Sequence, residues 1–107
     1  MELKQYAIIL VNLDPTVGSE IKKTRPCVII SPDEMNRQLR TLVVAPMTTR
    51  SRNYPTRVEV HHGQQTGWVV IDQIRSIDKQ RVIRLLGELT QPEIQAVKDV
   101  IEETFVK

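Results

Sequence analysis

The sequence predicts a mainly β protein, a strongly bent sheet or barrel of about five to seven short strands followed by one C-terminal helix. Over most of the chain, short apolar segments rich in Val, Ile and Leu alternate with polar segments that contain Pro or Gly. Near the C-terminus, the apolar residues recur at helical spacing instead. The chain has 107 residues, 40% of them hydrophobic, and no internal repeat or linker. Residues 1–107 are therefore expected to form one domain around one core.

The expected strands differ in how much of their surface they bury. In chain order they are Tyr6–Leu13, Pro26–Ile30, Thr41–Ala45, Arg57–His61, a long or bent strand from Trp68 to Ile77, and Val82–Leu89. The second is a continuous apolar run, as in a buried strand, whereas Arg57–His61 alternates polar and apolar residues, as in a half-exposed one. The third is expected to stop at Pro46.

The C-terminal helix is predicted to begin at Thr90. Thr90 and Glu93 have the spacing of a capping box, and Pro92 falls in the first turn, where its missing N–H costs nothing. The apolar residues that recur on one face of this helix are Ile94, Val97, Ile101 and Phe105. One further helical turn is expected at Asp33–Asn36.

The charged residues are unevenly distributed. The basic ones in the central stretch are Lys22, Lys23, Arg25, Arg37, Arg40, Arg50, Arg52 and Arg57, opposed by Asp33 and Glu34, whereas acidic residues predominate after Leu86. Such a domain can present a basic face to a polyanion. Basic residues scattered over a solvated surface explain the charges equally well.

Membrane and secretory classes do not fit the sequence. The longest apolar runs, Ala7–Val11 and Leu42–Pro46, are far shorter than the roughly 20 residues of a transmembrane helix. The N-terminus lacks the pattern of a secretory signal. Cys27 is the single cysteine and cannot form an internal disulfide, which favours a reduced, cytoplasmic location. One cysteine and two adjacent histidines also fall short of a usual zinc site, so we expect no metal and no cofactor.

Common catalytic motifs are absent from the sequence. There is no glycine-rich phosphate loop and no Gly-x-Ser-x-Gly motif. Cys27 lies in an expected core strand, where a thiol is a poor nucleophile. His61 and His62 should point to opposite faces of their strand, so at most one of them is expected to be catalytic.

Polar side chains gather where expected strands meet loops. Arg25 ends the polar loop before the second strand, and Thr48, Thr49 and Arg50 follow the third. Arg25 has an alternative interpretation, as an ion-pair partner of Glu20 or Asp72. The threonines have one too, since such residues often bond their own backbone in turns.

Several segments resemble the MazF/PemK toxins, also called mRNA interferases. The matching segments, in the family's order and spacing, are Val11–Glu20, Lys23–Pro32, Val44–Thr49, Tyr54–Thr56 and Asp72–Ile77. The resemblance implies an SH3-like β-barrel with a C-terminal helix, an obligate homodimer, cleavage of single-stranded RNA, and neutralisation by a cognate antitoxin protein. It also implies that Arg25 and Thr48 are the residues tied to cleavage, with Glu20 as an accessory. The sequence departs from many members at Lys4–Ala7, where an acidic residue is missing.

The chemistry of RNA suits this pair of residues. The 2′-hydroxyl of RNA can attack the adjacent phosphorus without a metal, giving a 2′,3′-cyclic phosphate and a 5′-hydroxyl. Arg25 can stabilise charge on the phosphoryl oxygens, and Thr48 can hold the in-line geometry. Neither is a convincing base, and Glu20, His61 or water is left open for that role.

The remaining polar residues are expected to bind RNA or to support the site. Those expected to bind RNA are Lys22, Lys23, Thr49, Arg50, Arg52, Asn53 and Tyr54, and those expected to form a supporting network are Asp72, Gln73 and Arg75. Two other functions remain open: a toxin of the same fold that inhibits DNA gyrase by protein binding, and a non-catalytic RNA-binding barrel.

Overall fold

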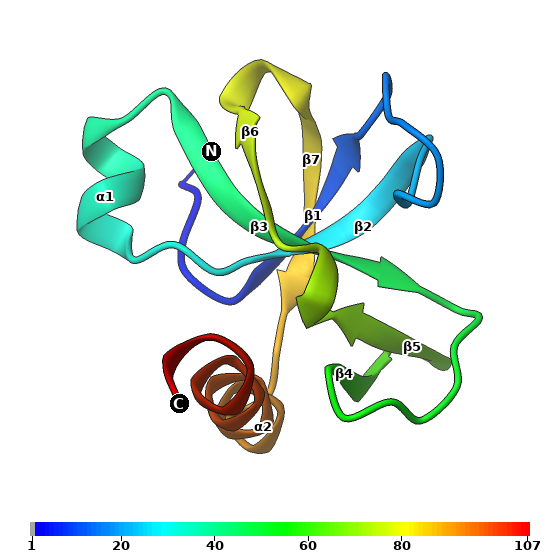
Figure 1. Cartoon of the computed structure of the whole chain (residues 1–107). Helices are drawn as coiled ribbons and strands as arrows, with labels where there is room; N and C mark the ends of the chain where they lie inside the picture. Colours follow the sequence, from blue (N-terminus) through cyan, green and yellow to red (C-terminus); the bar gives the residue numbers. More distant parts are fainter. Residues whose placement is uncertain (1) are drawn as a thin grey trace.

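The computed structural model describes residues 2–107, which form a single curled sheet and two α-helices (Figure 1). The strands are β1 (Ala7–Asn12), β2 (Thr24–Ile29), β3 (Thr41–Thr48), β4 (Arg57–His62), β5 (Gln65–Val70), β6 (Arg75–Asp78) and β7 (Val82–Glu88). All pairings are antiparallel, in the order β4-β5-β3-β2-β1-β7, and β6 also pairs with β3. The expected mainly β barrel with a C-terminal helix is confirmed, in the form of a curled half-barrel.

Strand β3 connects the parts of the sheet because it has different partners along its length. One of its edges pairs with β2, where Cys27 is opposite Pro46 and Ile29 is opposite Val44. The other edge pairs with β6 as far as Val44 and with β5 from Met47 onward. The β4–β5 hairpin is thereby attached beside the ends of β2 and β3 (Figure 1).

The prediction that the third strand ends at Pro46 was wrong. The carbonyl of Val43 accepts a hydrogen bond from Ile30, on the side of β2, so alternate residues such as Val44 and Pro46 direct their backbone groups toward the opposite edge. There the pairing with β6 ends at Val44 and that with β5 begins at Met47. Pro46 lies between these partners, where its missing N–H breaks no ladder hydrogen bond.

The long strand predicted from Trp68 to Ile77 is two strands, β5 and β6, joined by a 3₁₀ turn at Ile71–Gln73. Ile71 is fully buried, and its N–H donates to the carbonyl of Thr56 at 3.0 Å. This turn lets the chain leave β4 and join the other end of β3. Periodicity alone does not distinguish a bent strand from such a break, because the polar Asp72 and Gln73 interrupt the apolar stretch in either case.

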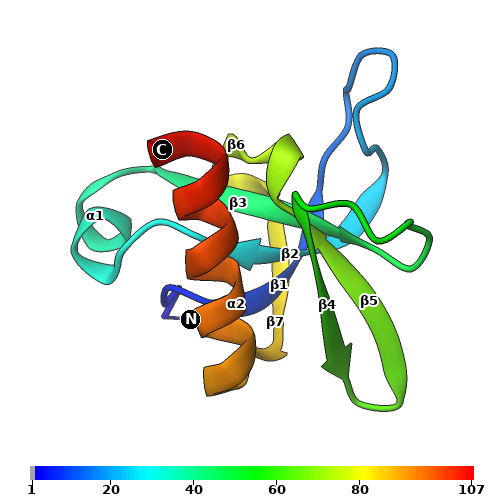
Figure 2. The same cartoon turned by 60° about the horizontal axis from the view of Figure 1, so that its bottom comes forward.

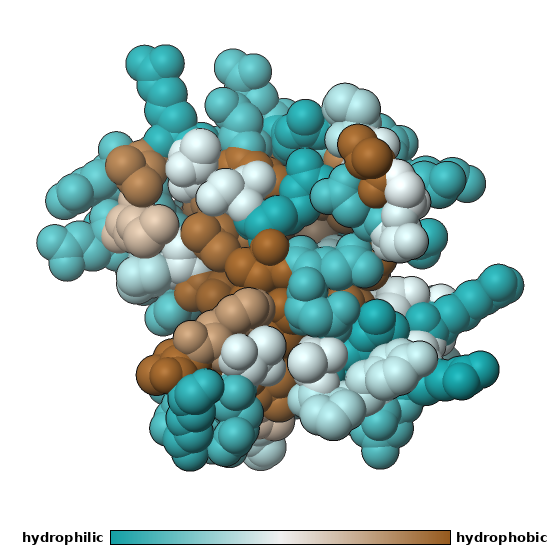
Figure 3. Space-filling model, in the orientation of Figure 1, coloured by the Kyte–Doolittle hydropathy of each residue, from teal (hydrophilic) through white to brown (hydrophobic). Residues whose placement is uncertain are grey.

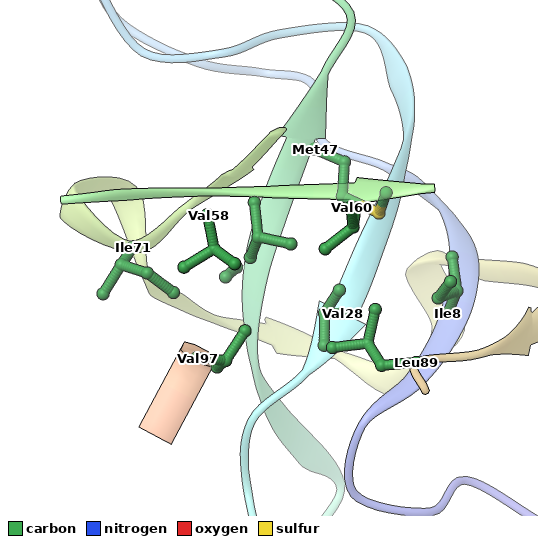
Figure 4. Close-up of a cluster of buried hydrophobic side chains, with 10 residues drawn as sticks. Ile8, Val28, Met47, Val58, Val60, Ile71, Leu89 and Val97 are labelled. Atoms are coloured by element: carbon green, nitrogen blue, oxygen red, sulfur yellow. The ribbon is translucent and has the colours of Figure 1, made fainter. Parts of the chain in front are cut away.

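The sheet buries apolar residues on both faces, in two clusters. One contains Ile8, Val28, Ala45, Met47, Val58, Val60, Val69, Ile71, Leu89 and Val97 (Figure 4), and the other contains Ala7, Ile9, Val11, Leu13, Cys27, Ile29, Leu42, Val44 and Ile77. Neighbouring residues of β1, β2 and β3 alternate between the two clusters, as the strand period requires. The expected core position of Cys27 is confirmed.

Helix α2 (Gln91–Ile101) continues in a single π-helical turn (Glu102–Val106) and packs across one face of the sheet (Figure 2). The predicted capping box is confirmed: Glu93 N–H donates to the Thr90 hydroxyl, and Thr90 N–H donates to the Glu93 carboxylate. Val97 is fully buried, whereas Phe105 is 58% exposed and does not extend the packed face as predicted. The predicted turn at Asp33–Asn36 is longer, α1 (Asp33–Gln38). Within residues 2–107, no helix has the length and apolar character needed to cross a bilayer.

We predict that Val97→Ala lowers the free energy of unfolding by about 2 kcal/mol, because it removes two buried methyl groups and leaves a cavity between α2 and β4. Urea denaturation would measure the change. Val106→Ala is the matched control, since that side chain is 73% exposed and its loss should change stability by less than about 0.5 kcal/mol. Equal effects of the two substitutions would contradict the packing described for α2.

Candidate active site

The predicted pair Arg25 and Thr48 lines one pocket of about 80 Å³ at the ends of β2 and β3. Polar residues on its wall are Arg25, Thr48, Thr49, His62, Gln65 and Thr66, and Ile8 and Met47 from the core contribute apolar surface. The register explains how the pair meets. Cys27 is opposite Pro46, and counting two residues outward along each strand places Arg25 opposite Thr48, on the same side of the sheet.

The Arg25 side chain is half-buried, and no carboxylate in residues 2–107 forms an ion pair with it. Its Nε donates to the carbonyl of Lys22 at 3.3 Å. The ion-pair partners considered from the sequence are engaged elsewhere: Glu20 accepts from Val17 N–H at 2.6 Å, and Asp72 pairs with Arg57. The terminal nitrogens of Arg25 are therefore available to an anion in the pocket.

The Thr48 hydroxyl is held by the turn that follows β3. Its Oγ1 lies 3.2 Å from both the N–H and the carbonyl oxygen of Arg50. The alternative interpretation, that this threonine bonds the backbone of its own turn, is therefore confirmed, but these bonds do not use the whole bonding capacity of the hydroxyl. A hydroxyl has two lone pairs, so after accepting from Arg50 it keeps one for a second donor such as a sugar hydroxyl.

Glu20 does not share this pocket. It lines a neighbouring one of about 230 Å³, together with Pro46 and the predicted network residues Asp72, Gln73 and Arg75. Because Glu20 is also engaged with Val17, the structure does not bring its carboxylate together with Arg25 and Thr48.

Two of these network residues tie the β1–β2 loop to the sheet. The Gln73 side-chain oxygen accepts from Ile21 N–H at 2.7 Å, and Arg75 donates to the carbonyl of Leu13 at 3.3 Å. This loop carries the exposed Lys22 and Lys23.

The third network residue, Asp72, anchors the β3–β4 loop. Its carboxylate accepts from the Thr56 hydroxyl at 2.8 Å and pairs with Arg57 at 3.4 Å. Arg57 also donates to Ser51 and lies 4.9 Å from the centre of the Tyr54 ring, so it joins three parts of the loop. This role of Arg57 was not predicted from the sequence. The expected RNA-binding residues Arg50, Arg52, Asn53 and Tyr54 are exposed on this loop. The loop lies at the lower right of Figure 1, a region that is mostly hydrophilic in Figure 3.

Asp72 has a lowered pKa. Burial raises the pKa of its carboxyl, but hydrogen bonds from Thr56 and Arg57 and the charge of Arg57 outweigh burial, and the pKa falls below its ordinary value. Cys27 shows the opposite balance. Burial raises the pKa of its thiol to about 12, against a smaller lowering by the charge of Arg75. The thiol is protonated at neutral pH, as expected for a core residue and not for a nucleophile.

The two histidines have different surroundings. The His61 ring is 3.1 Å from the Thr66 hydroxyl and 3.8 Å from Glu59, whereas His62 lines the pocket of Arg25 and Thr48. From the sequence, at most one of these two histidines was expected to be catalytic, and His61 was the one offered as a possible base. The alternation of β4 could have indicated His62, because Val58 and Val60 are its buried residues and His62 lies on their side of the strand.

Known proteins resemble this chain in sequence and in structure. Residues 4–105 match the model of the family described as PemK-like, MazF-like toxin of type II toxin-antitoxin system. The Endoribonuclease toxin MazF of Escherichia coli K12 is 34% identical over 85% of this chain and 83% of its own length. Endoribonuclease EndoA of Bacillus subtilis is 31% identical over 95% of this chain and 93% of its own.

The crystal structure of MazF from Deinococcus radiodurans superposes with a TM-score of 0.83 at 26% identity, over 94% of this chain and 93% of that one. The fold, the extent of the family match and the sequence identity to these relatives all indicate the same family. This chain belongs to the PemK-like, MazF-like toxin family of type II toxin-antitoxin systems.

Proposed function

We propose that this protein is a metal-independent, sequence-selective endoribonuclease that cleaves single-stranded RNA, acting as the toxin of a type II toxin-antitoxin system. Family membership and the endoribonuclease relatives support the activity. The observation that carries the assignment of the site is that Arg25 and Thr48, from two neighbouring strands, line one pocket.

The proposed reaction uses the nucleophile that RNA carries. The 2′-oxygen attacks the adjacent phosphorus in line, and the bond to the 5′-oxygen breaks, leaving a 2′,3′-cyclic phosphate and a 5′-hydroxyl. The guanidinium of Arg25 can donate two N–H groups to the phosphoryl oxygens, whose charge grows in the transition state. Thr48 can turn its O–H from the carbonyl of Arg50 to an oxygen of the scissile phosphate and hold that phosphate for in-line attack.

The loops on either side of the pocket form the proposed RNA-binding surface. Lys22 and Lys23 are exposed on one loop, and Thr49, Arg50, Arg52, Asn53 and Tyr54 follow β3 on the other. Arginine and tyrosine can stack on unpaired bases, and asparagine can read their edges. Asp72 holds the second loop through Thr56 and Arg57, and Gln73 holds the first, so the same turn positions both, and Arg75 at the start of β6 adds a contact to the first loop.

The partners and location follow from the same assignment. We expect the toxin to act as a homodimer in the cytoplasm and to be neutralised by a cognate antitoxin. A solved mycobacterial neighbour is described as an endoribonuclease in complex with its cognate antitoxin, and its fold resembles this one with a TM-score of 0.80.

Arg25→Ala is predicted to slow RNA cleavage by about 10²–10³-fold, because one positioned donor to the phosphoryl oxygens is lost. Arg25→Lys should recover only part of the rate, since an ammonium cannot fork two bonds onto one phosphate. The measurement is single-turnover cleavage of a single-stranded RNA in EDTA, with identification of the cyclic-phosphate ends. Arg37→Ala, on the exposed surface of α1 and away from the β4–β5 hairpin (Figure 1), is the matched control and should cleave like the parent.

The same assay separates the other two functions considered. Intact RNA that is nevertheless bound tightly would favour a non-catalytic RNA-binding barrel. Neither cleavage nor binding would favour a toxin that acts on a protein such as DNA gyrase. Full activity of Arg25→Ala would exclude Arg25 from the reaction.

The logarithm of the RNA affinity is expected to fall linearly with the logarithm of the salt concentration, because phosphate contacts release counterions. The double variant Arg50→Gln/Arg52→Gln should reduce the magnitude of that slope by about 1.4, at roughly 0.7 for each contact with single-stranded RNA. Fluorescence titration of a non-cleavable oligonucleotide measures the slope. An unchanged slope would remove these arginines from the proposed RNA-binding surface.

Asp72→Asn is predicted to destabilise the protein at neutral pH and to have less effect in acid. The pKa of Asp72 lies below its unfolded value of about 3.9, so its contribution is present above that value and is lost as the pH falls through the folded pKa. Urea denaturation of parent and variant, from neutral pH down through the folded pKa of Asp72, would measure the difference between their free energies of unfolding. That difference should become smaller as the pH falls. A difference that stays constant with pH would mean that the carboxylate charge is not the stabilising feature.

A further inference from the structure

We infer that His62 is the general base that removes the proton from the attacking 2′-hydroxyl. The inference rests on the proposed function, which leaves that proton without an acceptor. A guanidinium has no lone pair with which to accept a proton, and an unactivated hydroxyl such as that of Thr48 is a weak base. Glu20 lines a different pocket, and His61 is engaged with Thr66 and Glu59.

The first observation is the position of His62. It is the last residue of β4 and lines the same pocket as Arg25 and Thr48. Of the residues that line this pocket in the described structure, His62 alone has a side chain that ordinarily gains and loses a proton between pH 5 and 8. β2 contributes the charged Arg25, while β3 and β5 contribute the uncharged Thr48, Thr49, Gln65 and Thr66.

The second observation is how the ring is seated. β4 and β7 are the two ends of the strand order, and the curl of the sheet brings His62 against Gly87 of β7. A Cβ at Gly87 would lie 2.7 Å from Cε1 of the His62 ring, closer than real side chains approach. The absence of a side chain at Gly87 therefore gives the imidazole its place beside the pocket.

The third observation is that the ring is not committed elsewhere. In residues 2–107, neither ring nitrogen of His62 has a hydrogen-bond partner, whereas His61 Nδ1 lies 3.1 Å from the Thr66 hydroxyl. His62 is also exposed. An unengaged ring nitrogen can accept a proton from substrate, and this is the usual role of histidine in general acid–base catalysis.

The proposed step moves one proton and exchanges one bond at phosphorus. The 2′-O–H bond breaks and its proton moves to a neutral ring nitrogen of His62, while the 2′-oxygen forms a bond to phosphorus. The bond from phosphorus to the 5′-oxygen breaks, and that oxygen keeps the electron pair and takes a proton from water. The imidazolium then returns its proton to the hydroxide so formed. No metal, oxidant or further reactant is required.

The test is the pH dependence of single-turnover cleavage by the full-length protein. The parent rate should rise with pH through the range in which imidazole loses its proton and then level off. His62→Gln should slow cleavage by about 10²–10⁴-fold, and its rate should no longer level off as the pH rises. His61→Gln is the matched control, a neighbouring histidine that does not line the pocket, and should keep the parent's rate and profile.

Two further measurements separate proton transfer from RNA binding or folding. An oligonucleotide with a 2′-deoxy nucleotide at the cut site, which cannot be cleaved, should bind His62→Gln within about two-fold of the parent, and both proteins should melt alike. Imidazole added to the buffer should partly restore cleavage by His62→Ala. Gly87→Ala, which crowds the ring, should lower the rate while leaving binding of the deoxy oligonucleotide unchanged.

Distinct results overturn the two proposals. If the parent fails to cleave RNA, the proposed function falls and this inference falls with it. If the parent cleaves and His62→Gln keeps its rate and profile, the inference alone is overturned. It is also overturned if His62→Gln loses affinity for the deoxy oligonucleotide as much as it loses rate, because His62 would then bind RNA and not transfer a proton.

Discussion

The pairing of β2 with β3 is the constraint on which the rest of the site depends. Three residue pairs join these strands, from Cys27–Pro46 to Ile29–Val44, and all their side chains except that of Pro46 lie in the two buried clusters. A shift of one residue would move each apolar side chain to the wrong face, so burial fixes the register strongly. The same register sets Arg25 opposite Thr48 just beyond the last pair. The site is thus positioned by the core and not by its own polar contacts.

The loops that flank the pocket are held by a different device. One short turn, Ile71–Gln73, inserts between β5 and β6, and its polar side chains reach both loops. Gln73 bonds the backbone of the β1–β2 loop, while Asp72 bonds Thr56 and Arg57 of the β3–β4 loop. Loops rich in lysine and arginine repel one another and gain little from packing. Anchoring both loops to one turn keeps their positive charges near the pocket without requiring the loops to bury much apolar surface.

Sequence reasoning recovered the features that are set locally. The capping box at Thr90, the core position of Cys27 and the mainly β fold follow from residue type and spacing, which hold in any context. The features it missed are set by partners distant in sequence. Pro46 is tolerated within β3 only because two other strands leave a gap beside it. The break between β5 and β6 serves two different pairings of β3, and the polar Asp72 and Gln73 that mark it in the sequence fit a bent strand equally well.

The predictions for the pocket residues also divide into those that local sequence supports and those that depend on distant partners. Arg25 and Thr48 were predicted because each sits where a strand meets a loop, and because the family resemblance pointed to both. Glu20 was predicted on the resemblance alone, and the structure places it in a neighbouring pocket, where the backbone of Val17 occupies its carboxylate. The roles of all three remain predictions. What the structure adds is their grouping, which separates Glu20 from the pair.

His62 shows why pattern and topology are both needed to find a functional residue. Its face of β4 follows from the alternation of Val58, Val60 and His62, but that alternation says only that the ring points toward the core side. The curl of the sheet then decides what the ring meets there, because it brings β7 and Gly87 against the end of β4. Arg25 and Thr48 come from inner strands with partners that restrain them, whereas His62 comes from a terminal strand and keeps both ring nitrogens unengaged within residues 2–107. A fixed cation and a fixed hydroxyl suit alignment of the phosphate, and a less restrained imidazole suits a group that must change its protonation state in each turnover.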